Sequence, residues 1–299
     1  EIKPSEYLYG QNPRVMTSLE LDARFIRNDP ILEKAACAVF IQCVGSREPD
    51  RPYCSRVCCT HSVESALEMK RRNPAMAVYI LYRDIRTYGE REDLYTEARR
   101  KGVIFIRYDL DSKPKVGANG RNLEVVLHDP ILNRPVALSA DLLVLASAIE
   151  PPDNENLARF FKVPVNEDGF FMEAHAKLKP VEFATDGVFL CGLAHYPKSV
   201  DESISQALAA ASRATCLLAK SRVSVSGMVA ETNPALCSQC GTCVSICPYS
   251  APYFNEHGKA QVNPALCKGC GLCTASCRSG AIRLQGFDDA QIFAMIESI

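Results

Sequence analysis

Two near-identical runs of cysteine in the last third of the chain constrain its fold and chemistry more than any other feature. Both runs have the spacing C-x2-C-x2-C-x3-C, which in two-cluster ferredoxins holds two [4Fe-4S] clusters. Three thiolates of each run bind one cluster, and the fourth thiolate binds the cluster of the other run. One predicted cluster therefore has the ligands Cys237, Cys240, Cys243 and Cys277, and the other has Cys267, Cys270, Cys273 and Cys247.

Zinc and disulfides are the alternatives for these cysteines. A structural zinc site takes four ligands in total, as paired C-x2-C hooks with a longer spacer between them. Two runs of four cysteines fit a pair of clusters better. The 299-residue chain has fifteen cysteines. The chain looks intracellular, and in such a protein so many cysteines indicate metal binding and not disulfides.

Length and composition exclude several classes of protein. A chain of this length, with 47% hydrophobic and 23% charged residues, is globular and long enough for two or three domains. The net charge of −1 gives no reason to expect nucleic acid as a partner. No run approaches the ~20 apolar residues that a membrane span needs, and no signal peptide is visible, so we expect a cytoplasmic protein. The chain starts with Glu1 instead of methionine, which suggests that an N-terminal piece is missing.

A second group of cysteines lies in a predicted strand–helix–strand unit. The expected strands cover residues 38–46 and 77–82, and the expected helix opens near Cys54 and continues to Arg72. The first strand-to-helix turn lacks the G-x-G-x-x-G pattern of a dinucleotide site. It carries cysteines instead, and Cys54 and Cys58, four residues apart, would share one helix face. Four thiols would then converge at the carboxyl end of the strands: Cys43, Cys54, Cys58 and Cys59. Buried free cysteines are the alternative.

Several motifs resemble the A-subunit of heterodisulfide reductase and its bacterial relatives over nearly the whole chain. They are residues 42–47 (QCVGSR), 53–59 (YCSRVCC), 9–20 (YGQNPRVMTSLE), 84–86 (DIR), 187–192 (GVFLCG), 197–198 (PK) and both ferredoxin runs. The resemblance implies an α/β thioredoxin-reductase-like flavoprotein body that binds FAD. It also implies a third [4Fe-4S] cluster, held by Cys43, Cys54, Cys58 and Cys59, and leaves Cys37 with a structural role.

The elements expected to bind the flavin form an incomplete site in this chain. Strands are expected at residues 140–146 and 185–192, followed by an alanine-rich helix at 203–218. Such a unit closes the flavin site in thioredoxin-reductase-like proteins, although an alanine-rich helix can also be merely close-packed. The resemblance places Gly192, Pro197, Lys198 and Ser199 near FAD, with Lys198 as the catalytic cation; a solvated loop lysine is the alternative. The N-terminal FAD unit, with its G-x-G-x-x-G turn, is absent from the chain; either the piece before Glu1 was lost or a separate chain supplies it.

The sequence thus predicts an N-terminal extension (1–35), a thioredoxin-reductase-like α/β domain with an inserted cysteine cluster site (36–222), a ferredoxin domain with two [4Fe-4S] clusters (233–285) and a C-terminal helix (286–299). A linker at 221–232 would join body and ferredoxin domain. The resemblance implies a subunit of an anaerobic electron-bifurcating or electron-confurcating oxidoreductase complex. Its partners would be ferredoxin and disulfide-reductase-type or hydrogenase- or dehydrogenase-linked iron–sulfur subunits, with a homodimer as a further expectation. The alternative is a non-catalytic wiring or scaffold subunit that carries only iron–sulfur clusters.

Overall fold

The computed structural model describes residues 1–120, 122–222 and 227–298, and it divides into two compact units. The first unit comprises Glu1–Asn154, Val165–Phe171 and Cys191–Ala207. The second comprises Glu155–Pro164, Met172–Leu190 and Leu208–Ile299.

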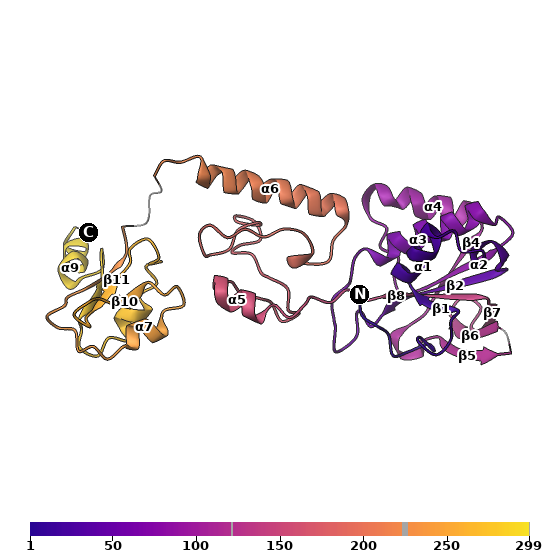
Figure 1. Cartoon of the computed structure of the whole chain (residues 1–299), viewed down its shortest axis with the longest axis horizontal. Helices are drawn as coiled ribbons and strands as arrows, with labels where there is room; N and C mark the ends of the chain where they lie inside the picture. Colours follow the sequence, from indigo (N-terminus) through magenta and orange to yellow (C-terminus); the bar gives the residue numbers. More distant parts are fainter. Residues whose placement is uncertain (121, 223–226, 299) are drawn as a thin grey trace. The chain divides into compact units, whose positions relative to one another are not determined.

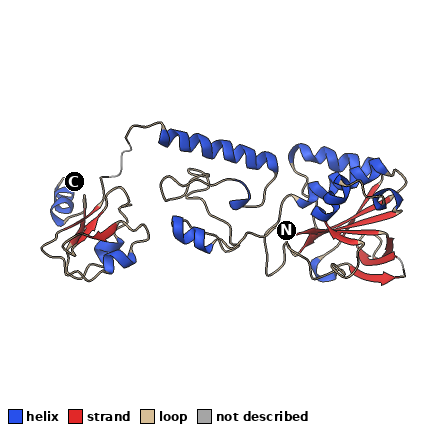
Figure 2. Cartoon of the chain, in the orientation of Figure 1, coloured by secondary structure: helices blue, strands red, loops and turns tan. Residues whose placement is uncertain are grey.

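A five-stranded parallel sheet forms the centre of the first unit (Figures 1 and 2). Its apolar strands are buried, as a parallel sheet covered on both faces requires. The strands predicted at 38–46, 77–82 and 140–146 are confirmed, with boundaries that differ by a few residues. The order across the sheet is β1 (Val15–Thr17), β8 (Leu142–Ser147), β2 (Cys37–Val44), β3 (Ala77–Tyr82) and β4 (Val103–Arg107).

Helices cover one face of this sheet, where a core forms around Phe40, Val63 and Met69. The start of α1 is fixed by a capping box, in which Thr17 and Glu20 exchange hydrogen bonds between side chain and backbone. The helices are α1 (Ser18–Ile26), α2 (Ile31–Lys34), α3 (Cys58–Arg72) and α4 (Glu92–Arg100), with the 3-10 turn η1 (Gly89–Arg91) before α4.

An antiparallel three-stranded sheet covers the other face (Figure 1). Leu123 and Leu138 pack there against Ile41 of the parallel sheet. The hairpin of the antiparallel sheet consists of β6 (Asn122–Asp129) and β7 (Arg134–Ala140). A further strand, β5 (Lys115–Asn119), pairs with β6, and the 3-10 turn η2 (Leu110–Ser112) precedes it. These two packed layers confirm the α/β class.

The second unit contains a small ferredoxin-type fold. Strand β9 (Ala230–Thr232) pairs with β12 (Ile282–Leu284), and β10 (Pro252–Phe254) pairs with β11 (Ala260–Val262). Short helices α7 (Thr242–Ile246) and α8 (Leu272–Ala275) follow the two cysteine loops. The remaining helices are α5 (Glu155–Phe161), α6 (Val200–Leu218), which crosses the boundary between the units, and the expected C-terminal helix α9 (Asp289–Glu297).

Some sequence-based expectations are wrong in detail. Residues 185–192 form no strand: Gly187 has a left-handed φ of +81°, and an isolated bridge joins Phe189 to Glu182. The expected linker at 221–232 lies partly outside the described residues, and its end, Ala230–Thr232, is strand β9. Within the expected N-terminal extension, β1 pairs with β8 of the central sheet.

Candidate iron–sulfur centre

Cys43 lies in a strained turn at the carboxyl end of β2. Its φ is +60°, and Gly45 and Arg47 follow with φ values of +67° and +58°. Non-glycine residues in this left-handed region cost roughly 1–3 kcal/mol each and persist where the surroundings hold them. The turn directs the buried Cys43 thiol to the edge of the sheet where parallel folds bind ligands.

Cys58 and Cys59 are the first two residues of α3, and both are buried. A helix N-terminus favours negative charge, so this position suits thiolates. Cys54 lies before the helix, because the left-handed φ of Arg56 (+62°) keeps α3 from starting earlier. The expectation that Cys54 and Cys58 share a helix face is therefore wrong. The backbone N–H of Arg56 donates to Cys54 Sγ at 3.3 Å.

The electrostatics of the four thiols indicate that they converge. A hydrogen bond with Cys59, followed by burial and the nearby Cys43 and Cys54, raises the pKa of Cys58 well above its ordinary value. The same bond lowers the pKa of Cys59 to about 7, against the effect of burial and with help from the backbone N–H of Arg86. Burial raises the pKa of Cys43, which also feels Cys59. Cys43, Cys54, Cys58 and Cys59 are therefore near enough to affect one another's charge. As they stand, no three or more His, Cys, Asp or Glu side chains of the described residues are arranged to hold a metal ion.

Four arginines and two carboxylates surround these thiols. Arg47 and Arg86 both pair with Asp84, at 2.6 and 3.6 Å, and Arg56 pairs with Glu202 at 3.1 Å. The fourth arginine, Arg83, is buried. A cavity beside the thiols is lined by Cys54, Arg56, Arg86, Tyr88 and Tyr196.

Thiolates are the ligands that a [4Fe-4S] cube takes, so this donor set suits such a cube by its chemistry. Four thiolates around an oxidised cube leave about two net negative charges. The arginines exceed the carboxylates by the same amount, so the surroundings can balance the cluster. Cys37 lies at the other end of β2, where burial and Asp141 raise the pKa of its thiol to about 11. It has no place in the cluster site.

The ferredoxin-type fold repeats one local arrangement twice. The N–H of Ala260 donates to Cys237 Sγ at 3.4 Å, and the N–H of Ala230 donates to Cys267 Sγ at 3.3 Å. Gly241 and Gly271 precede α7 and α8 with φ values of +78° and +75°. The two cysteine runs therefore fold alike, which follows from their common spacing.

A small cavity in this fold joins cysteines from both runs. Its lining includes Cys267, Cys270 and Cys273 of the second run and Cys247 of the first. The charges of Cys267, Cys247 and Cys270 also raise the pKa of Cys273, after burial. In the other half, Cys237 and Cys240 are near Cys243 and raise its pKa in the same way. Cys247 thus lies with the second run, as the crossed pattern predicts for that half.

Lys198 is buried, so the alternative of a solvated loop lysine is wrong. Its ammonium donates to Gly192 O at 3.0 Å and Gln206 Oε1 at 2.8 Å, and it lies 3.2 Å from His195 Nδ1. Gly192 opens the 3-10 turn η3 (Gly192–Ala194), and Pro197 and Ser199 flank Lys198 before α6. The predicted flavin residues therefore do lie together around one buried cation.

The phosphate side of a flavin site is not evident in the described residues. The first turn of α6 carries Asp201 and Glu202, which pair with Arg91 and Arg56. Carboxylates at a helix N-terminus compete with a pyrophosphate for the same positive end. The residues near Lys198 thus fit FAD in part: they offer a buried cation but no phosphate cradle.

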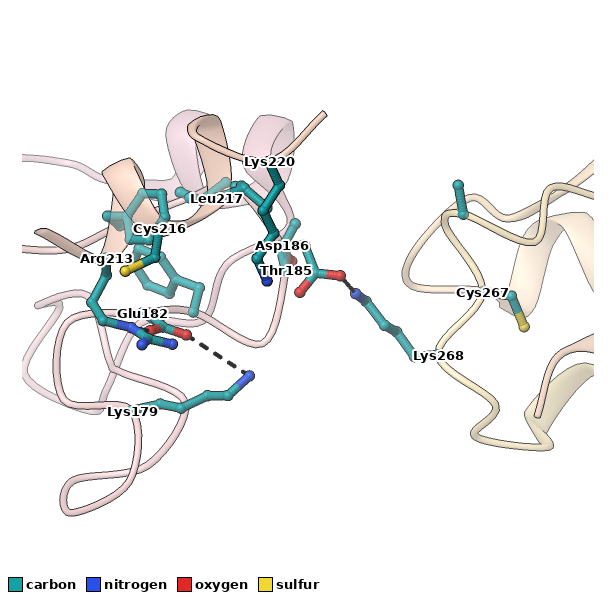
Figure 3. Close-up of a pocket in the computed structure, with 15 residues that line it drawn as sticks. Lys179, Glu182, Thr185, Asp186, Arg213, Cys216, Leu217, Lys220, Cys267 and Lys268 are labelled. Carbon is teal, nitrogen blue, oxygen red and sulfur yellow. Dashed lines mark hydrogen bonds and ion pairs between the residues drawn. The ribbon is translucent and has the colours of Figure 1, made fainter. Parts of the chain in front are cut away.

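The far end of α6 adds no further thiol chemistry among the described residues (Figure 3). Arg213 and Lys179 both pair with Glu182, Lys179 at 3.9 Å. Cys216, beside Arg213 in the view, is exposed, as is Cys191. Arg213, Lys179 and Glu182 form an ion-pair group.

Comparison with known proteins bears on both units. Residues 236–281 match the family model described as a 4Fe-4S dicluster domain. A protein of Archaeoglobus profundus, named as similar to the heterodisulfide reductase A-subunit, is 42% identical over 271 residues, which are 87% of this chain and 38% of that protein. The A-subunit of the H(2):CoB-CoM heterodisulfide,ferredoxin reductase of Methanothermobacter marburgensis is 38% identical over 309 residues, 98% of this chain and 46% of that protein.

The chain belongs to the heterodisulfide reductase A-subunit family. It spans less than half the length of these two relatives. Among solved structures, the thioredoxin reductase of T. acidophilum resembles it with a TM-score of 0.46 and 12% identity, over 73% of this chain and 61% of that one. The family match confirms the resemblance noted in the sequence, and the dicluster match confirms the ferredoxin-type domain.

Sequence reasoning missed the arginines of the cysteine site. Arg83 directly follows β3, the parallel neighbour of β2, and its Nη2 donates to Cys43 O at 3.3 Å. A polar residue at the carboxyl end of a buried strand is a signal that could have identified it.

Proposed function

We propose that this chain is an electron-transfer portion of a heterodisulfide-reductase-type oxidoreductase and holds three [4Fe-4S] clusters. The observation that carries the proposal is the convergence of Cys43, Cys54, Cys58 and Cys59 inside a group of arginines. Such a site suits a cluster better than a set of inert core thiols, because inert thiols need no cations around them.

The other two clusters belong to the ferredoxin-type domain with crossed ligands. Cys237, Cys240, Cys243 and Cys277 bind one, and Cys267, Cys270, Cys273 and Cys247 bind the other. The cavity that joins Cys247 to the second run supports this assignment. The domain then takes electrons from, or gives them to, an external carrier.

The partners follow from what the relatives are called. The name of the Methanothermobacter protein includes hydrogen, the CoB-CoM heterodisulfide and ferredoxin. We infer that this chain works in a complex that couples a ferredoxin to a disulfide-reductase-type partner, with electron bifurcation or confurcation at a flavin. Hydrogenase- or dehydrogenase-linked iron–sulfur subunits, a cytoplasmic location and a homodimer complete the proposal. None of the described helices combines the length and apolar character that a bilayer crossing requires.

FAD is the proposed fourth cofactor, although the described residues supply part of its site. When bound, a flavin exchanges electrons one or two at a time. Lys198 would place a positive charge beside it from a buried position, and Gln206 and Gly192 O hold that ammonium in place. A fixed cation in a water-poor site acts more strongly than one in water.

The second candidate is an electron-wiring subunit without a catalytic flavin. The acidic first turn of α6 favours it, because Asp201 and Glu202 occupy the place where a pyrophosphate would bind. Flavin content of the isolated complex distinguishes the two candidates.

The decisive experiment is to determine iron, sulfide and flavin on anaerobically purified protein, with EPR of the reduced state. The three-cluster proposal expects about twelve iron atoms per chain, four per cube. A yield of about eight, with EPR signals from the ferredoxin-type domain alone, would contradict the third cluster. Absence of flavin from the intact complex would favour the wiring subunit.

A further inference from the structure

Arg83 differs from the other arginines of the cysteine site in its burial. Arg83 is 8% exposed, whereas the side chain of Arg86 is 46% exposed. A buried guanidinium keeps its charge, because an arginine in a protein does not release its proton. Burial of such a charge is costly unless an opposite charge lies nearby.

Arg83 hydrogen-bonds three backbone carbonyls of one turn, and its side chain also hydrogen-bonds the Cys43 thiol. Nη1 donates to Arg47 O at 2.8 Å, and Nη2 donates to Cys43 O at 3.3 Å and to Ser46 O. Its Nε is buried with no hydrogen-bond partner. Across residues 1–120, 122–222 and 227–298, no carboxylate forms an ion pair with Arg83. The other three arginines of the site each pair with Asp84 or Glu202.

The position of Arg83 indicates which negative group could pair with its buried charge. Strands β2 and β3 are parallel neighbours, and Arg83 follows β3 at the end where β2 reaches Cys43. The Arg83 guanidinium holds the carbonyls of the turn that orients this thiol. An iron–sulfur cluster with four thiolates is a compact negative group at the same edge of the sheet.

We propose that Arg83 is the buried counter-charge of the cluster held by Cys43, Cys54, Cys58 and Cys59, and that it raises the reduction potential of this cluster. The inference rests on the proposed third cluster. Reduction adds one electron to the cube and makes it more negative, so a fixed cation in a buried place stabilises the reduced form. Arg83 affects electron transfer only through its effect on the cluster, so it is a positioning residue and not a catalytic one.

The test measures the midpoint potential of this cluster by EPR-monitored titration of the full chain, purified anaerobically. The signal is identified as the one that Cys58→Ser removes. Arg83→Met should lower the potential by at least one tenfold change in the ratio of oxidised to reduced cluster, about 59 mV for one electron. Arg83→Lys keeps the charge and should retain most of the wild-type value. Arg86→Met removes the same charge from an exposed position, where water screens it, and should have a smaller effect.

Each outcome decides the role of Arg83. An unchanged potential in Arg83→Met, or an equal shift in Arg86→Met, would overturn the proposal. If Arg83→Met loses this cluster while Arg83→Lys keeps it, the need for a cation is supported. Loss of the cluster in both variants would also overturn it, because the shape of arginine and not its charge would then matter. Failure of the third cluster itself is separate, because wild-type protein would then have about eight iron atoms and no signal sensitive to Cys58→Ser.

Discussion

The backbone N–H of Ala260 donates to Cys237 Sγ at 3.4 Å, and the residue before it, Lys259, donates from Nζ to the carbonyl oxygen of Cys237 at 2.8 Å. In the other half of the ferredoxin-type fold, Ala230 repeats the first bond to Cys267, but Val229 stands where Lys259 would be. One cluster site therefore has a nearby cation that its counterpart lacks at the equivalent position.

This difference predicts unequal potentials. Lys259→Met should lower the midpoint potential of the cluster bound by the first run, by less than about 59 mV because the lysine is half-buried. Val229→Lys should raise the potential of the other cluster. EPR-monitored titration of both variants checks the pair. A shift of the wrong cluster in either variant would contradict the equivalence of the two positions.

Loss of one thiol should remove the proposed third cluster. We expect Cys58→Ser and Cys54→Ser each to reduce the iron content from about twelve to about eight atoms per chain. Cys37→Ser is the matched control, since this thiol lies at the opposite end of β2 and should leave the iron content unchanged. Iron and acid-labile sulfide analysis gives the answer. Unchanged iron in both site variants would leave these residues as core thiols.

Crossed ligation predicts an unusual pattern of damage. Cys277→Ser should impair the cluster of Cys237, Cys240 and Cys243, although Cys277 belongs to the other run. Cys247→Ser, its mirror image, should impair the cluster of the second run, whose cysteines line a cavity with Cys247. EPR of the two variants separates the signals. Damage confined to the run that carries each substitution would refute the assignment.

Lys198→Met should weaken the segment that precedes α6. The buried ammonium holds Gly192 O and Gln206, and loss of these bonds should cost about 1–3 kcal/mol in the free energy of unfolding. Denaturant titration measures this cost, with the exposed Lys220→Met as control. If FAD binds beside Lys198, its midpoint potential should also fall in Lys198→Met. An unaltered stability and an unaltered flavin potential would show that the lysine has neither role.

The sequence predicted the strands and ferredoxin-type loops because their signals are local. An apolar run such as 77–82 is buried wherever the sheet forms, and the spacing of Cys237, Cys240 and Cys243 dictates a loop around a cluster. The segment at 185–192 was predicted wrongly, because a short apolar run became a turn at Gly187 with a single bridge.

The charges around the cysteine site could not be predicted without the tertiary structure. Arg83 is forty positions from Cys43, and the parallel pairing of β2 with β3 brings the two within hydrogen-bonding distance. The left-handed φ of Arg56 likewise could not be predicted from its residue type, yet it keeps helix α3 from extending back to Cys54. Long-range register and backbone strain are thus the parts of the site that composition and spacing do not encode.

The first and last strands of the ferredoxin-type fold are direct neighbours, with Ala230 the register partner of Leu284. The chain enters and leaves this fold at one point, so the fold is built like a cassette that can be placed into a longer polypeptide without separating what comes before it from what comes after. The same closeness makes it suited to circular permutation: a short link from Leu284 to Ala230, with new ends opened in the turn at Gly258, would leave both cysteine loops whole.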